Sequence, residues 1–179
     1  MSTCTYCGHL NTDGVDECVE CQAPLSDLHL ADPGPVEQGL LSDRIAALVT
    51  RPPRVVPPGT PVGDVLALLT AESVGCVLVM DGGRIVGIFS ERDALLRLNA
   101  RAEELAGHPV AEFMTPNPEC LDGSAKIAFA LQRMDLGGYR HVPVVDADGR
   151  ATGVISIRDV LRYLTDRMTR AAGAEPAGP

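Results

Sequence analysis

Four of the six cysteines lie in the first 21 residues, as two pairs that each enclose two residues. The paired cysteines are Cys4, Cys7, Cys18 and Cys21. Two residues between thiols allow one tight turn to direct both sulfurs at a single ion, and two such turns complete a tetrahedral four-thiolate zinc site. Iron or a redox dithiol is the alternative. Gly8 follows the first pair, where the chain turns with positive φ, whereas Gln22 follows the second.

Residues 4–25 resemble the short zinc ribbons found at the ends of many bacterial and archaeal proteins. Such a segment buries too little surface to fold alone, so bound zinc would supply its stability, about 10–16 kcal/mol in comparable peptides. It carries four acidic residues and no Lys or Arg, which argues against nucleic-acid binding. We expect a structural or protein-docking module in which His9 is a surface residue and not a ligand.

A second pattern, Ser-x-Arg-Asp, occurs twice in the chain. Its residues are Ser90, Arg92, Asp93, Ser156, Arg158 and Asp159. One interpretation is a capping box, in which the serine and the acid satisfy free N–H groups at a helix start. The other is a nucleotide site, because a helix start and arginine side chains favour phosphate and a carboxylate can accept from both ribose hydroxyls.

Both copies of the Ser-x-Arg-Asp pattern lie in an internal repeat. Residues 75–96 match residues 140–162, with an offset of 65 before a turn and 66 after it. Thr50-Arg-Pro-Pro and Thr115-Pro-Asn-Pro also match at an offset of 65. The chain therefore contains two copies of one unit, and the second copy has one extra residue in its turn.

Each copy is expected to contain a strand, a helix, two strands joined by an Asp-Gly type turn, and a last helix that begins at Ser90 or Ser156. The expected strands cover residues 54–56, 76–80, 85–89, 119–121, 141–145 and 151–155. The expected first helices cover residues 62–72 and 124–135. Before the first copy, apolar residues at Leu40, Leu41, Ile45, Leu48 and Val49 predict one short helix, with Asp43 and Arg44 facing solvent.

Glycine, two apolar residues and Ser-x-x-Asp after a strand hairpin, found twice about 65 residues apart, resembles a pair of CBS domains. The joint at residues 110–118 and the strand at residues 140–146 resemble the same family, so the resemblance covers residues 46–165. It implies an α/β, pseudo-symmetric pair of small sheets packed by helices, which usually forms a disc-like dimer. It also implies an adenosine-containing ligand between the copies, with Asp on the ribose and Ser near the phosphates.

The repeat places four more residues beside such a ligand. Gly75 and Cys76 are small and could admit a flat base, whereas Arg140 and His141 could meet phosphates. Their alternatives are a surface ion pair for Arg140 and a neutral, hydrogen-bonded side chain for His141. Thr60 matches a family position that often contacts the ligand. Because the copies differ here, we expect two unequal sites.

The remaining cysteines, Cys76 and Cys120, are expected to pack as small apolar residues. His108 is expected to be structural. Leucines of the last helices are expected to form core or a dimer face, and they are Leu95, Leu96, Leu98, Leu161 and Leu164.

The expected boundaries are a zinc ribbon at 1–25, a linker and short helix at 26–45, CBS copies at 46–108 and 109–166, and a disordered tail at 167–179.

Composition limits the function. The net charge is −9, and the first 43 residues hold eight acids and no Lys or Arg, so neither nucleic acid nor an anionic membrane is an expected partner. No export signal or membrane span is apparent, which predicts a cytoplasmic protein. The sequence shows neither a paired nucleophile and base nor an open metal site, so we do not expect an enzyme.

We therefore expect a non-enzymatic, homodimeric regulator that senses AMP, ADP, ATP or S-adenosylmethionine and relays this to an unknown protein partner, with zinc as a structural cofactor. The alternative is a ligand-free dimeric scaffold with a structural ribbon.

Overall fold

The computed structural model describes residues 1–25, 34–49 and 52–173. The chain divides into two compact units, Met1–Thr50 with Gly123–Val142 and Ile155–Pro179, and Arg51–Asp122 with Pro143–Val154. Residues 26–33 of the expected linker and residues 174–179 of the expected tail lie outside the described residues. Among the described residues, no helix combines the length and apolar character needed to cross a membrane.

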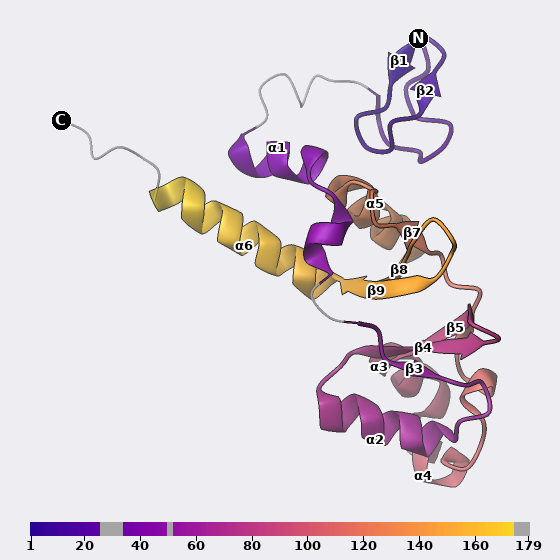
Figure 1. Cartoon of the computed structure of the whole chain (residues 1–179). Coiled ribbons are helices and arrows are strands. Elements are labelled where there is room, and N and C mark those ends of the chain that lie inside the picture. The colour runs from indigo at the N-terminus through magenta and orange to yellow at the C-terminus, as the bar shows by residue number, and fades with distance from the viewer. Residues whose placement is uncertain (26–33, 50–51, 174–179) are drawn as a thin grey trace. The chain divides into compact units, whose positions relative to one another are not determined.

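The ribbon is built from two turns of the same design. Strands β1 (Ser2–Thr3) and β2 (Leu10–Asn11) pair in antiparallel fashion beside them (Figure 1). Gly8 N donates to the carbonyl of Cys4, and Gln22 N donates to that of Cys18, 2.9 and 2.8 Å away. Gly8 has φ 81° and Gln22 has φ 59°, so the second turn adopts the left-handed conformation without a glycine.

The first copy forms a four-stranded sheet in the order β3-β4-β5-β6. Its strands are β3 (Val55–Val56), β4 (Cys76–Asp81), β5 (Arg84–Ser90) and β6 (Thr115–Pro116). Helix α2 (Val62–Glu72) matches its expected bounds, and its buried residues join those of β4 and β5 in one core. Gly82 and Gly83 both have positive φ, as the tight β4–β5 turn requires.

The segment after β5 is irregular, although one continuous helix was expected from Ser90. It is divided into α3 (Glu91–Asp93), π-helical η3 (Ala94–Leu98), 3₁₀ helix η4 (Asn99–Arg101) and α4 (Ala102–Leu105). Asn99 has φ 48°, a left-handed value at the break between η3 and η4. The wider π turn buries Leu98 in the core and leaves Leu95 and Leu96 exposed.

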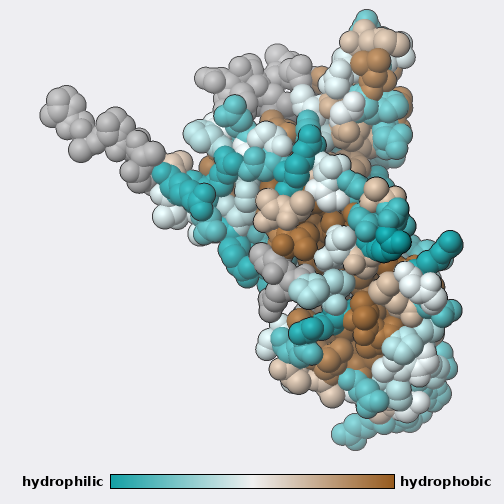
Figure 2. Space-filling model, viewed as in Figure 1, coloured by the Kyte–Doolittle hydropathy of each residue, from teal (hydrophilic) through white to brown (hydrophobic). Residues whose placement is uncertain are grey.

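The second copy forms a three-stranded sheet in the order β7-β8-β9. Its elements are β7 (Leu121–Asp122), α5 (Ile127–Gly137), β8 (His141–Val145), β9 (Ala151–Ser156) and α6 (Ile157–Gly173). Helix α5 begins three residues after the expected position, because Lys126 is extended at its N-cap. Helix α6 continues to Gly173, beyond the expected boundary of a tail at residue 167, and its face in Figure 2 is mostly hydrophilic.

The short helix expected before the first copy is two elements, α1 (Pro35–Ser42) and the 3₁₀ helix η2 (Ile45–Leu48). Asp43 and Arg44 are extended between them, with ψ of 149° and 146°. Helix α1 therefore begins inside the region expected to be linker, where Pro35 occupies the first turn. Asp43 is not simply solvent-facing, because it accepts a hydrogen bond of 2.7 Å from Tyr163.

The segment that precedes each copy pairs with the helix start of the other copy. Arg44, before the first copy, forms a β-bridge with Lys126 of the second. Pro109, before the second copy, forms the same bridge with Pro61 of the first. The two bridges are related by the repeat offset of 65. Accordingly, residues 109–122 of the second copy fall in the compact unit that holds residues 51–108 of the first.

Candidate functional site

The four paired cysteines meet at one point of the ribbon. Their Sγ atoms all lie within 4.8 Å of one another, and the Cys4–Cys21 and Cys7–Cys18 sulfurs are each 3.6 Å apart. A tetrahedral zinc ion with bonds of about 2.3 Å places its sulfurs about 3.8 Å apart. These donors therefore fit a four-thiolate metal site, and His9 is outside the group, as expected.

Hydrogen bonds from the protein surround the sulfurs. The backbone N of His9 donates to Sγ of Cys7 at 3.4 Å, and Nδ2 of Asn11 lies 3.5 Å from Sγ of Cys18. Burial raises the pKa of Cys18, but hydrogen bonds from backbone amides and Asn11 outweigh this and lower the pKa to about 6. Burial raises the pKa of Cys7 and of Cys21. Such N–H donors orient metal-ligating sulfurs and stabilise their charge.

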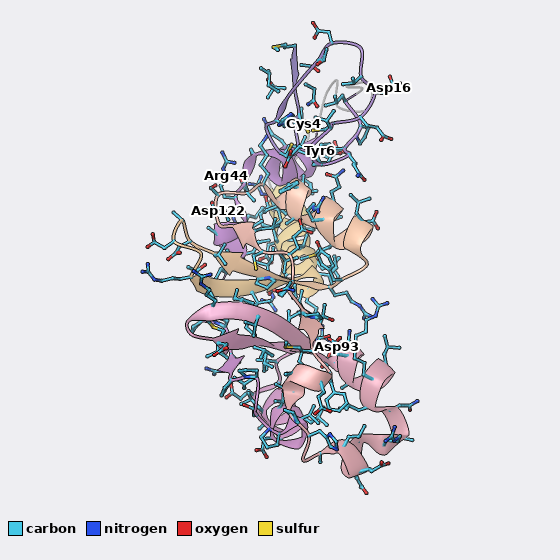
Figure 3. The ribbon with its side chains drawn as sticks, turned by 90° about the vertical axis from the view of Figure 1, so that its right-hand side faces the viewer. Cys4, Tyr6, Asp16, Arg44, Asp93 and Asp122 are labelled. Atoms are coloured by element: carbon cyan, nitrogen blue, oxygen red, sulfur yellow. The ribbon has the colours of Figure 1, made fainter. Side chains whose placement is uncertain are left out.

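The first Ser-x-x-Asp segment closes on itself at the end of β5. Oδ2 of Asp93 accepts the backbone N–H of Ser90 at 3.0 Å and its hydroxyl at 2.6 Å. The backbone N of Asp93 lies 3.4 Å from Oγ of Ser90. This is the capping box that the sequence offered as one of its two interpretations, and it holds the carboxylate in one orientation (Figure 3).

The second segment repeats this geometry at the end of β9. Oδ2 of Asp159 accepts the backbone N–H of Ser156 at 2.8 Å and its hydroxyl at 2.6 Å. Arg162 lies 3.7 Å from the other carboxylate oxygen, Oδ1. Both copies therefore use Oδ2 to fix the carboxylate and direct Oδ1 to other groups.

In the first copy, Oδ1 has a partner that the sequence analysis missed. Thr115 donates from Oγ1 to Oδ1 of Asp93 at 2.9 Å. Arg97 lies 3.6 Å from the same oxygen, donates to the carbonyl of Phe113 at 2.9 Å and also to that of Met114. Thr115 stands in a motif already quoted from the repeat, but its contact with Asp93 depends on β6 pairing with β5, which no local pattern predicted.

Residues at the start of the second strand of each copy lie beside its Ser-x-x-Asp segment. The carbonyl of Gly75 accepts from the backbone N of Glu91 at 3.1 Å, and Cys76 pairs with Ser90 in the sheet register. In the second copy, the carbonyl of Arg140 accepts from the backbone N of Ile157 at 3.0 Å. His141, next in the chain, begins β8 and is half-buried.

The other predicted residues are placed less decisively. Arg92 and Arg158 are exposed. Thr60 lies on the loop before α2, where its backbone bonds to Pro57 and Val110. These backbone hydrogen bonds connect Thr60 to the joint between the copies. Of the two cysteines outside the ribbon, Cys76 is buried and Cys120 is half-buried.

The comparisons with known proteins agree with this fold. The CBS domain family matches residues 45–100 and 110–166. A 17.7 kDa protein of Acidianus ambivalens is 28% identical over 74% of this chain and 80% of its own length. The meiotically up-regulated gene 70 protein of Schizosaccharomyces pombe is 33% identical over 59% of this chain, which spans 14% of that longer protein.

A solved CBS domain protein of Pyrobaculum aerophilum, complexed with AMP, has a TM-score of 0.60 and 28% identity, covering 69% of this chain and 99% of its own. The two sheets packed by helices, the repeated Ser-x-x-Asp geometry and the family match define a tandem CBS pair. The chain belongs to the CBS domain family, and it carries a four-cysteine cluster in front of that pair.

Proposed function

We propose that this protein is a non-enzymatic regulator whose CBS pair binds an adenosine-containing ligand, AMP, ADP, ATP or S-adenosylmethionine, and relays its presence to a protein partner. The signal would be a difference in ligand affinity between two arrangements of the protein. The ribbon would hold zinc as a structural or docking module, and the protein would act as a cytoplasmic homodimer.

The observation that carries this proposal is the carboxylate fixed in the same way in both copies. An ionised carboxylate has about four acceptor sites, and two of those on Asp159 are taken by Ser156. Oδ1 of Asp159 remains able to accept a ribose hydroxyl. The same oxygen of Asp93 already accepts from Thr115. This difference supports two sites of unequal affinity, and AMP in the Pyrobaculum relative supports the ligand class.

A ligand-free dimeric scaffold is the second candidate. Several large apolar side chains remain exposed on the last helices of the copies: Leu95 at 73%, Leu96 at 71%, Leu161 at 56% and Met168 at 61%. Apolar surface of this kind favours association with another protein surface. A second copy of this chain is the proposed occupant, because helical faces join such pairs in the family.

Thermal unfolding of the zinc-loaded full chain tests the proposal. AMP, ADP, ATP and S-adenosylmethionine would be titrated separately, with GTP as the control for the base and 2′,3′-dideoxyadenosine monophosphate as the control for the ribose. A ligand at one hundred times its Kd adds about 2.7 kcal/mol, which raises Tm by several degrees.

Asp93→Asn and Asp159→Asn keep the shape of each side chain but remove its charge. We expect the Asp159 variant to lose most of the ligand-induced rise and the Asp93 variant to lose less. If no adenosine ligand changes Tm while the protein remains a dimer in sedimentation, the sensor proposal fails and the scaffold is favoured.

A further inference from the structure

The ribbon lacks side-chain cations of its own. Residues 1–25 hold four acidic side chains and no Lys or Arg. A divalent metal bound by four thiolates adds a net charge of about −2. A cation supplied by another part of the chain would therefore stabilise the loaded ribbon.

Lys126 supplies that cation. It is the only lysine of the chain, and its Nζ donates to the carbonyl of Thr5 at 2.5 Å. Thr5 lies inside the first cysteine pair, between Cys4 and Cys7. Lys126 is half-buried and forms the N-cap of α5, where its backbone bridges to Arg44. Its position is therefore fixed from both the α5 side and the ribbon side.

An apolar contact accompanies this hydrogen bond. Phe129, one helical turn after Lys126, packs against the buried cluster of the ribbon. That cluster consists of Cys4, Cys18, Cys21 and Ala23, and Tyr6 and Leu25 also pack against it. Figure 3 shows Cys4 and Tyr6 at the end of the ribbon beside the helices, with Asp16 at its far side. The first turn of α5 thus presents the charge of Lys126 and the ring of Phe129 to the same end of the ribbon.

We propose that the metal-loaded ribbon is an intramolecular clamp on the second CBS copy, docked on α5 through Lys126 and Phe129 and released when the metal is lost. The Thr5 carbonyl and the apolar cluster keep their positions only while the cysteines are bound to one ion, because so short a segment does not fold without it. Binding of the metal would therefore determine how well ordered the first turn of α5 is. The inference rests on the metal site proposed above.

Hydrogen exchange of the full chain tests this clamp. The amide of Ile127 bonds to the carbonyl of Asp43, and that of Ala130 bonds to the carbonyl of Lys126. We expect removal of zinc with a chelator to accelerate exchange in residues 1–25 and also, about tenfold, in the peptide covering residues 126–134. Exchange in α2, at the corresponding place of the first copy, should not change.

The variants separate the clamp from the metal site itself. Lys126→Met keeps the aliphatic stem, so it should still bind one zinc per chain, with about fivefold weaker affinity in competition with a chromophoric chelator. It should also show fast exchange in residues 126–134 with zinc bound, as should Phe129→Ala. Lys126→Arg should restore slow exchange. Arg170→Met removes an exposed cation of α6 and should behave as the wild type.

Two results would overturn the inference, and they are distinct. If zinc binds and its removal changes exchange in residues 1–25 but not in 126–134, the clamp is wrong and the metal site stands. If the wild type binds no zinc, the metal site fails, and with it the clamp. The chelator comparison on the wild type remains decisive even if a variant at Lys126 unfolds.

Discussion

Thr115 and Asp93 are joined by a hydrogen bond of 2.9 Å, from Oγ1 of the threonine to Oδ1 of the aspartate. Thr115 begins β6, within the joint between the copies, whereas Asp93 belongs to the Ser-x-x-Asp segment after β5. Arg97 donates to the carbonyls of Phe113 and Met114, next to the threonine. The joint is therefore hydrogen-bonded directly to the Asp93 carboxylate, which is expected to contact a ribose.

Replacing this threonine should weaken the joint and free the carboxylate of the first copy for a ligand. Thr115→Val keeps the side-chain shape but removes the donor to Oδ1. We expect a loss of about 1 kcal/mol in the free energy of unfolding, measured by urea denaturation without ligand. We also expect several-fold tighter adenosine-ligand binding to the first copy, because Oδ1 of Asp93 regains an acceptor site for a ribose hydroxyl; calorimetry in an Asp159→Asn background measures it.

Thr70→Val is the matched control, because Thr70 is exposed and its hydroxyl bonds only within its own helix, to the carbonyl of Leu66. Its unfolding free energy should stay within about 0.5 kcal/mol of the wild type. Equal stability losses in the Thr115 and Thr70 variants would contradict a special role for the bond to Asp93.

The contact between Asp43 and Tyr163 should make stability depend on pH in the acid range. The hydrogen bond from Tyr163 is the main cause that lowers the pKa of Asp43; burial opposes it and Arg167 reinforces it. Because the folded pKa lies below the unfolded value of about 4, the stabilisation is complete above that value and is lost as pH falls through the folded pKa. Its size should be about 1 kcal/mol, since the pair is partly exposed.

The measurement is the difference in unfolding free energy between the wild type and Tyr163→Phe, from pH 7 to pH 2.5. A chelator in all samples removes the contribution of metal binding. The difference should shrink towards zero below about pH 3. Tyr6→Phe, a ribbon variant, should show no such trend, and a difference for Tyr163→Phe that is constant across the range would exclude Asp43 as its cause.

The fold of each copy was largely predictable because its signals are local. Helix α2 and strand β8 have their expected bounds, and the Asp-Gly turns and serine caps lie where the repeat placed them. The irregular segment after β5 was not predictable, because residues 91–105 carry a normal helical pattern. The π turn at Ala94–Leu98 depends on which leucine packs in the core, and that residue is Leu98.

The cysteine cluster and the two Ser-x-x-Asp segments were likewise predictable, since each follows from a short stretch of sequence. Contacts between distant segments were not. Lys126 is 121 residues from Thr5, and Asp43 is 120 residues from Tyr163. Both follow from the exchange of leading segments between the copies, for which the sequence holds no local pattern.

Gly39 should be required for the packing of α1 on α6. A Cβ atom there would lie 2.5 Å from Oη of Tyr163 and 2.6 Å from Cζ of Arg167, the two side chains that bond to Asp43. Gly39→Ala should gain about 1 kcal/mol of helix propensity and yet lower the unfolding free energy by about 1 kcal/mol net, because both bonds to Asp43 are displaced.

Gly107→Ala is the control for this substitution, because a Cβ there meets no atom within 4 Å and its φ is not positive. It should leave stability unchanged or slightly raised. The Gly39 variant should also lose the acid dependence described for Asp43. A stabilised Gly39→Ala protein with that dependence intact would show that α1 moves aside at no cost.

The cysteines should divide into two classes, those that bind the metal and those that do not. Cys18→Ser removes one of four converging sulfurs and should abolish binding of one zinc per chain, measured by metal analysis after gel filtration. Cys120→Ser should keep full metal content, because Cys120 lies outside the cluster and its pKa is raised by burial and by Glu119. In the zinc-loaded wild type, a thiol reagent should label neither class rapidly, since the ribbon thiols are metal-bound and Cys76 is buried. Metal loss in Cys120→Ser, or full metal content in Cys18→Ser, would contradict a four-thiolate site.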